Sequence, residues 1–285
     1  MPAAADPDQY DDVAERGFED HACWPITETL LDLVQIGPGG KLLDIACGTG
    51  IVARRAARRL GSTGRAVGVD LSRGRLEYAR RLSATDGLVT TEFIFMDACS
   101  LEFAENSFDA AVAQFPHLPD RATCFRGILT VLRPGGWFAI GNGGGGAPRW
   151  PGCRAPVFSG RQEAILDGVF DRMFSESFRG ATAAAPSRPG PVIASPDQEL
   201  LAAGFVEVQS WSCDHTAPFL SGADAFEFEA TRNSGFRTLR SSLSPGLVAE
   251  FRNRYIAEAD RRRQDGGAIG LTSGALIAAG RKPIE

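Results

Sequence analysis

The residues best placed to bind a ligand lie in one short stretch, where an apolar run breaks into a glycine turn. Asp44 lies in the apolar run, and Gly48 and Gly50 follow before apolar residues resume at helical spacing. This pattern predicts a strand, a tight loop and the start of a helix. Because glycine has no Cβ, a ligand can lie against such a loop at the helix N-terminus. The stretch is therefore a candidate cofactor-binding loop, although an ordinary strand-to-helix turn has the same shape.

The glycines alone fit two kinds of cofactor. Residues 48–53 satisfy the G-x-G-x-x-A form of the dinucleotide fingerprint. A fixed negative charge at Asp44 would oppose a pyrophosphate near the helix start, but it would suit the ammonium group of a cofactor that carries an amino acid. Asp44 therefore favours the second kind of cofactor.

Two further carboxylates follow the next predicted strands. Asp70 ends the strand 67–70 and lies 20 residues after Gly50, the spacing at which a βαβ unit brings a carboxylate to the ribose of a nucleoside. Leu71 would then cover one face of the adenine. Asp97 follows the strand 93–96 and faces the same edge of a parallel sheet. Helix capping is the alternative role for Asp70, and turn chemistry is the alternative for Asp97.

On these residues the chain resembles the class I S-adenosylmethionine-dependent methyltransferases, especially those of quinone biosynthesis and natural-product pathways. Ala46 stands where that family most often has its first glycine. The run Leu132-Arg133-Pro134-Gly135-Gly136 also falls where the family has such a turn, and the resemblance covers residues 42–141. It implies S-adenosylmethionine as the cofactor, with Asp97 accepting from the adenine amino group. The implied cofactor site consists of Asp44, Ala46, Gly48, Gly50, Asp70, Leu71, Asp97, Ala98 and Gln114.

Methyl transfer from this cofactor requires little covalent chemistry from the protein, because the leaving group is a neutral thioether. Positioning of the acceptor can supply roughly 7 to 11 kcal/mol of the barrier. His117, in the loop after the fourth predicted strand, is the candidate catalytic residue, since an imidazole can take a proton from a phenol or an enol. A structural hydrogen bond in the loop fixed by Pro116 and Pro119 is the alternative. The histidines are far apart in sequence, so we expect no metal site.

The charge balance argues against nucleic acid as a partner. The chain has 285 residues, with 30 basic and 35 acidic side chains and a net charge of -5, without a long basic run. Its six cysteines form no C-x-x-C pair, which favours a reduced, cytoplasmic setting. Cys47 is interpreted as an apolar filler of the loop rather than a nucleophile. Neither a leader peptide nor a membrane span is expected.

The order of elements predicts an α/β fold, a Rossmann-like seven-stranded mostly parallel sheet with helices on both faces and a helical lid. Residues 1–24 are expected to be a mobile N-terminal segment and residues 25–146 the cofactor-binding core. Residues 147–204 are expected to form the helical lid, hinged at Gly143 to Gly146, with a helix from Ile165 to Phe174. Residues 205–285 would supply the C-terminal strands, with inserted helices, that complete the sheet.

The predicted function is methyl transfer from S-adenosylmethionine to oxygen or carbon of a small molecule. Phenylalanines accumulate outside the common core, which favours an apolar or aromatic acceptor. One alternative is a protein of this fold that uses the cofactor for another reaction or as a binding module. Another is a nicotinamide oxidoreductase, which Asp44 and the lack of a Tyr-x-x-x-Lys pair disfavour. The acceptor, the methylated atom and a homodimeric state are left open.

Overall fold

The structure is a computed structural model that describes residues 24–143, 164–166, 168–178, 195–232, 236, 239–240, 242–263 and 269–285. The N-terminal segment before Trp24, the residues of the predicted hinge after Gly143 and most of the predicted lid lie outside these ranges. None of the described helices combines the length and the apolar character that a bilayer crossing needs.

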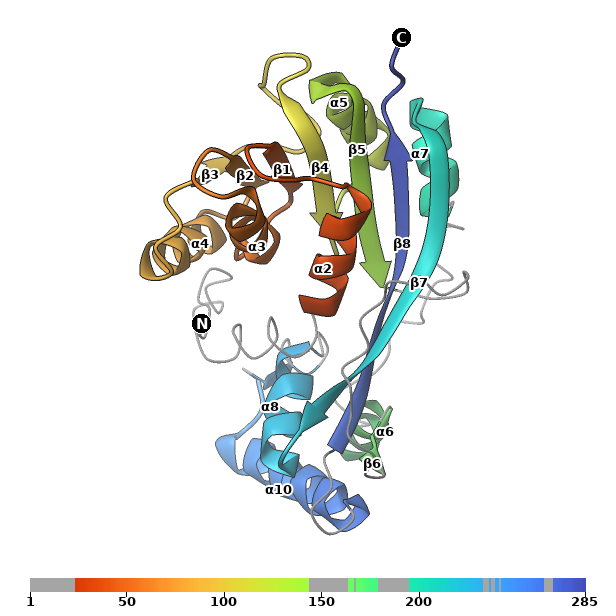
Figure 1. Ribbon diagram of the computed structural model, residues 1–285. Helices are drawn as coiled ribbons and strands as arrows, with labels where there is room; N and C mark the ends of the chain where they lie inside the picture. The colour runs from red at the N-terminus through yellow and green to blue at the C-terminus, as the bar shows by residue number, and fades with distance from the viewer. Residues whose placement is uncertain are drawn as a thin grey trace.

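One mixed sheet organises the chain (Figure 1). Its strands run in the order β3-β2-β1-β4-β5-β8, with β7 along the other edge of β8. The first five strands are mutually parallel, and β8 is antiparallel to both β5 and β7. This confirms the predicted α/β class and its mostly parallel sheet. The strands are β1 (Lys41–Ile45), β2 (Arg65–Asp70), β3 (Thr91–Phe95), β4 (Phe108–Gln114), β5 (Leu132–Gly143), β6 (Ala164–Ile165), β7 (Val206–Phe219) and β8 (Ile269–Arg281).

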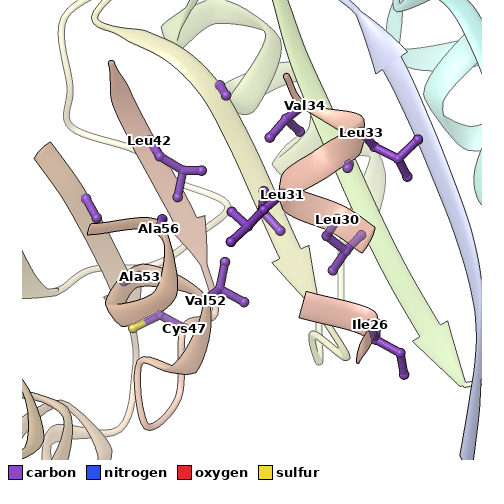
Figure 2. Close-up of a cluster of buried hydrophobic side chains, with 14 of the residues drawn as sticks. Ile26, Leu30, Leu31, Leu33, Val34, Leu42, Cys47, Val52, Ala53 and Ala56 are labelled. Carbon is purple, nitrogen blue, oxygen red and sulfur yellow. The ribbon is translucent and has the colours of Figure 1, made fainter. Parts of the chain in front are cut away.

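Helices cover both faces of the parallel half. One face carries α2 (Trp24–Leu33), α3 (Ile51–Leu60) and α4 (Arg73–Thr85), and the other carries α5 (Arg121–Val131) and α7 (Pro196–Ala203). Figure 2 shows Leu30, Leu31 and Val52 in the first of these two buried layers, where α2 and α3 meet the sheet. The two apolar layers hold the carboxyl ends of β1, β2 and β4 in fixed register.

A second apolar core surrounds the far ends of β7 and β8 (Figure 1). It is enclosed by α6 (Val169–Ser177), α8 (Gly222–Arg232) and α10 (Pro245–Arg262). Phe170 packs within 5.2 to 5.6 Å of the rings of Phe226, Phe236, Phe251 and Tyr255. The clustered phenylalanines therefore form a core of their own, so they do not support the inference of an aromatic acceptor pocket drawn from their number.

The C-terminal half differs most from the sequence-based prediction. β7 and β8 are much longer than the short apolar segments 205–208 and 275–279 by which the sequence indicates strands in this half. The helix predicted from Ile165 is wrong at its start, because residues 164–165 pair with β8 and Leu166 N donates to Gly270 O. The helix begins only after Gly168, at φ 70°. Pairing with the edge of β8 therefore makes residues 164–165 a strand, although their apolar periodicity is helical.

The loop between β1 and α3 has unusual backbone geometry. Ala46 has φ 52°, Gly48 has φ 53° and Gly50 has φ 78°. A Cβ on Gly50 would lie 2.7 Å from the Phe93 ring, so this position requires glycine for space as well as for conformation. Ala46, by contrast, holds a left-handed conformation that costs a side chain about 1 to 2 kcal/mol.

Asp44 supports the same loop from inside the protein. It is 1% exposed, and its Oδ2 accepts from Ala53 N at 3.0 Å, in the first turn of α3. Burial, to which the negative charge of Asp70 adds, raises the pKa of the Asp44 carboxyl to about 8. Asp44 therefore joins the strand to the N-terminus of the helix.

We expect Ala46→Gly to stabilise the fold by about 0.5 to 1 kcal/mol. Glycine removes the steric strain of the left-handed conformation at φ 52°, and this gain exceeds the cost of the larger conformational entropy of the unfolded chain. The matched control is Ala249→Gly on the exposed face of α10, which should cost about 1 kcal/mol. Urea unfolding at neutral pH measures both. Equal destabilisation by the two changes would contradict the assigned loop conformation.

The pH dependence of stability should report the buried carboxyl. Since the folded pKa of Asp44 is about 8 and lies above the unfolded value of about 3.9, the folded state binds more protons, and stability falls as pH rises through that window. Asp44→Asn keeps an acceptor for Ala53 N but cannot ionise. Its unfolding free energy relative to the parent should rise by more than about 1 kcal/mol from pH 4 to pH 8. Parallel pH profiles would exclude a raised pKa.

Candidate cofactor-binding site

A cavity of about 570 Å³ opens at the carboxyl edge of the parallel strands. This is the edge at which open α/β sheets bind ligands, and the volume suits a small molecule or cofactor. The cavity brings together six residues that the sequence singled out. They are Ala46, Asp70, Leu71, Asp97, Ala98 and His117.

Asp70 is the central polar group of the cavity. Its Oδ2 accepts from Gly48 N and its Oδ1 accepts from Ser72 N, both at 2.8 Å. The N-cap residue of α4 is Ser72 rather than Asp70, because the Ser72 side chain accepts from Arg75 N at 3.2 Å. A carboxylate offers about four acceptor positions, so Asp70 can also accept from two hydroxyl groups of a ligand. The arrangement suits a ribose.

The glycine loop leaves room beside Asp70. A Cβ placed on Gly48 would find the Arg75 guanidinium as its nearest neighbour, at 3.8 Å, so the space over this backbone is open. The loop leads into the N-terminus of α3, whose dipole favours a polar or anionic group nearby. These features fit a nucleoside cofactor that lies against the loop.

The end of β3 forms a second wall of the cavity. Asp97 is exposed, and its Oδ1 accepts from Cys99 N at 2.9 Å, which is the turn chemistry considered for it. Ala98 is buried beneath the cavity, while Leu71 is 59% exposed. Asp97 thus has a structural role in its turn and also lies where it can meet an adenine, and its contact with the amino group stays a prediction.

Three predicted site residues serve as scaffold around the cavity rather than lining it. Asp44 and Gly50 support the loop from below, and Gln114 forms a hydrogen bond with Thr27 Oγ1 at 2.6 Å. A direct contact of Asp44 or Gln114 with the cofactor therefore stays a prediction. Gly48 borders the cavity through its N–H bond to Asp70.

The loop 115–119 lines the cavity and is called the roof loop here. Phe115 has φ 50° and donates its N–H to Gly141 O at 2.7 Å, so a side chain other than glycine is held in a sparsely populated conformation. Phe115 is 37% exposed, and His117 is exposed beside it. The roof loop places an aromatic ring and an imidazole at the same cavity.

Sequence reasoning missed Arg75, Met96 and Phe115 as lining residues. Arg75 could have been found, because it lies in the first turn of α4, directly after the Asp70 turn. Met96 follows β3 by one position, next to Asp97. Nothing in the sequence pattern signals the backbone conformation that exposes Phe115.

The cysteines differ from the sequence-based expectation of reduced thiols. Cys99, which lines the cavity, and Cys124, in α5, form a disulfide with their Cα atoms 4.2 Å apart. The cytoplasmic location therefore stays a prediction. Burial, with the negative charges of Asp44 and Asp70, raises the pKa of the Cys47 thiol well above its ordinary value, as expected of a filler. Among the described residues, no group of histidine, cysteine and acidic side chains could hold a metal ion.

Comparison with known proteins adds independent findings. Residues 42–136 match the family described as a methyltransferase domain. The chain is 38% identical over 138 residues to methyltransferase GfsG of Streptomyces halstedii, covering 47% of each chain. It is 32% identical over 191 residues to the nocamycin O-methyltransferase of Saccharothrix syringae, covering 65% of this chain and 66% of that one. The chain thus spans between about half and two thirds of the length of these relatives.

Solved structures share the fold. Phosphoethanolamine N-methyltransferase 2 of Haemonchus contortus, in complex with S-adenosylhomocysteine, has a TM-score of 0.53 at 18% identity, covering 96% of this chain and 58% of that one. The [4+2]-cyclase SpnF has a TM-score of 0.50 at 21% identity, covering 91% and 81%. Taken with the family match and the curated relatives, the glycine loop and the acid-lined cavity lead to one conclusion. Residues 42–136 form a methyltransferase domain of the class I S-adenosylmethionine-dependent type, and S-adenosylmethionine is its cofactor.

Proposed function

We propose that this protein transfers the methyl group of S-adenosylmethionine to oxygen or carbon of a small, largely apolar or aromatic metabolite. The observation that carries the proposal is the cavity itself, in which Asp70 and Asp97 share one space with the roof loop. The proposal therefore assigns nucleoside binding and acceptor binding to neighbouring parts of one cavity. The two curated relatives, GfsG and the nocamycin O-methyltransferase, support methyl transfer, and the name of the second favours oxygen.

The cofactor, when bound, supplies an activated methyl group on a positively charged sulfonium. The residues of this chain would then mainly bind the cofactor and orient the acceptor toward its methyl group. Asp70 would accept from the ribose hydroxyls, Leu71 would cover the adenine and Asp97 would accept from its amino group. Asp44, beneath the glycine loop, would favour the ammonium group in its ionised form, and a bound cation would in turn lower its raised pKa of about 8.

The roof loop supports an apolar acceptor. The loop contributes apolar surface to the cavity through Phe115, Pro116, Leu118 and Pro119. It also contributes the imidazole of His117. An apolar wall excludes water from the acceptor, while one positioned base can remove a proton from a hydroxyl or an acidic carbon. This local composition, rather than the phenylalanine core around β7 and β8, is the basis for the proposed substrate class.

The parent protein should convert S-adenosylmethionine to S-adenosylhomocysteine only when a suitable acceptor is present. A panel of phenols, enols and apolar carboxylic acids, followed by mass spectrometry of the products, measures this. Cofactor binding without methylated product across the panel would favour the alternative of a binding module or a different reaction. Product from phenols and enols but not from carboxylic acids would favour the proposed proton removal.

Asp70→Ala should weaken S-adenosylmethionine binding about ten- to a hundredfold, because it removes a charged acceptor worth about 1.5 to 3 kcal/mol per hydrogen bond. Asp109→Ala is the matched control, since Asp109 Oδ2 also accepts a backbone N–H, from Lys41 at 2.7 Å, but at the opposite edge of the sheet. Titration calorimetry measures both variants. Equal losses in the two would assign the effect to the fold, and no loss in Asp70→Ala would remove it from the site.

His117→Ala tests the catalytic role of the imidazole. If His117 accepts the acceptor's proton, turnover should fall about a hundred- to ten-thousandfold while cofactor affinity is preserved, because the side chain touches only the acceptor. The acid-side inflection of the rate profile should also disappear. Turnover within about threefold of the parent at every pH would assign catalysis to positioning alone.

A further inference from the structure

We propose that Cys99 and Cys124 form a reversible thiol–disulfide crosslink that controls how tightly the cavity holds the cofactor. The inference rests on the cofactor site described above. It adds a redox dependence that methyl transfer itself does not require.

The crosslink joins two walls of the cavity. Cys99 lies in the turn after β3, where its N–H donates to Asp97 Oδ1 at 2.9 Å. Its partner Cys124 lies in α5, which begins directly after the roof loop and is capped by Asp120. The Cys99 sulfur also lies 3.4 Å from Asp120 O. The covalent bond therefore ties the turn that carries Asp97 to the segment that positions His117.

The turn at Asp97 depends on short-range contacts for its shape. Besides the bond to Cys99 N, Ser100 N donates to Asp97 O at 3.0 Å, and Ala98 is buried beneath the cavity. The disulfide bond to α5 restricts the conformations of this turn before a ligand binds. A preorganised wall loses less conformational freedom on binding, so the crosslinked form should bind the cofactor more tightly.

The two sulfurs differ in how accessible they are to an external thiol, and this difference sets the order in which they react. Cys99 is half-buried and lines the cavity, whereas Cys124 is fully buried. A thiolate of an external dithiol attacks the Cys99 sulfur, and the electron pair of the broken S–S bond leaves on Cys124, which then takes a proton. The second thiolate of the dithiol attacks the mixed disulfide and releases Cys99. One disulfide is reduced and one external dithiol is oxidised, and the reverse reaction restores the crosslink.

Reciprocity gives a second consequence. If crosslinking strengthens cofactor binding by some factor, bound cofactor must favour the crosslinked form by the same factor. The cofactor would also cover the cavity side of Cys99, where the attacking thiolate enters. Bound S-adenosylhomocysteine should therefore both slow the reduction and shift its equilibrium.

The test compares oxidised and dithiothreitol-reduced full-length protein. Peptide mapping without reduction identifies the linkage, and calorimetry with S-adenosylhomocysteine gives the affinity of each form. We expect binding to be about three- to tenfold weaker after reduction. Cys99→Ser and Cys124→Ser should bind like the reduced parent and lose the response to reductant. Cys213→Ser, which removes another buried thiol, should keep that response.

Each outcome decides the proposal. Equal affinities of the mapped crosslinked form and the reduced form overturn the redox control but leave the cofactor site intact, as does failure of an oxidant to link Cys99 with Cys124. Absence of binding in both forms overturns the cofactor site as well. Far-UV circular dichroism of the serine variants shows whether a lost affinity comes from unfolding. A variant that unfolds is replaced in the comparison by the parent with Cys99 and Cys124 alkylated after reduction.

Discussion

The site depends on the carboxylate of Asp70, which joins three segments at the carboxyl edge of the sheet. From the end of β2 it accepts from Gly48 in the glycine loop and from Ser72 at the start of α4. The bond from Gly48 fixes the loop from the side of the cavity, and the space over Gly48 stays open to a ligand. Asp70 therefore shapes the cavity, and under the proposed function it would also be the main acceptor for the ligand.

A second acid, Asp44, supports the same loop from the opposite side. It is buried beneath the loop and accepts from the N-terminus of α3, whereas Asp70 borders the cavity. Burial raises the pKa of Asp44 to about 8, so its ionisation falls close to neutral pH. The loop is thus held between a buried carboxyl group and a cavity-facing carboxylate, and Ala46 retains its left-handed conformation between them.

The parallel half of the fold and the residues that meet there could be predicted from the sequence. Carboxyl ends of parallel strands share one edge, so acids that follow β2 and β3 must approach the glycine loop. The antiparallel pair β7 and β8 could not be predicted in the same way, because its length depends on pairing between segments far apart in the chain. A parallel pairing with the start of β8 also places Ile165, predicted to be helical, in β6. The link between Cys99 and Cys124 also joins residues that no spacing rule connects.

A crystal structure with S-adenosylhomocysteine would locate the ligand relative to named side chains. We expect the ribose hydroxyls at the Asp70 carboxylate, the adenine between Leu71 and the Asp97 turn, and the thioether facing the roof loop. A nucleoside bound elsewhere, or with its ribose away from Asp70, would show that this cavity is not the cofactor site.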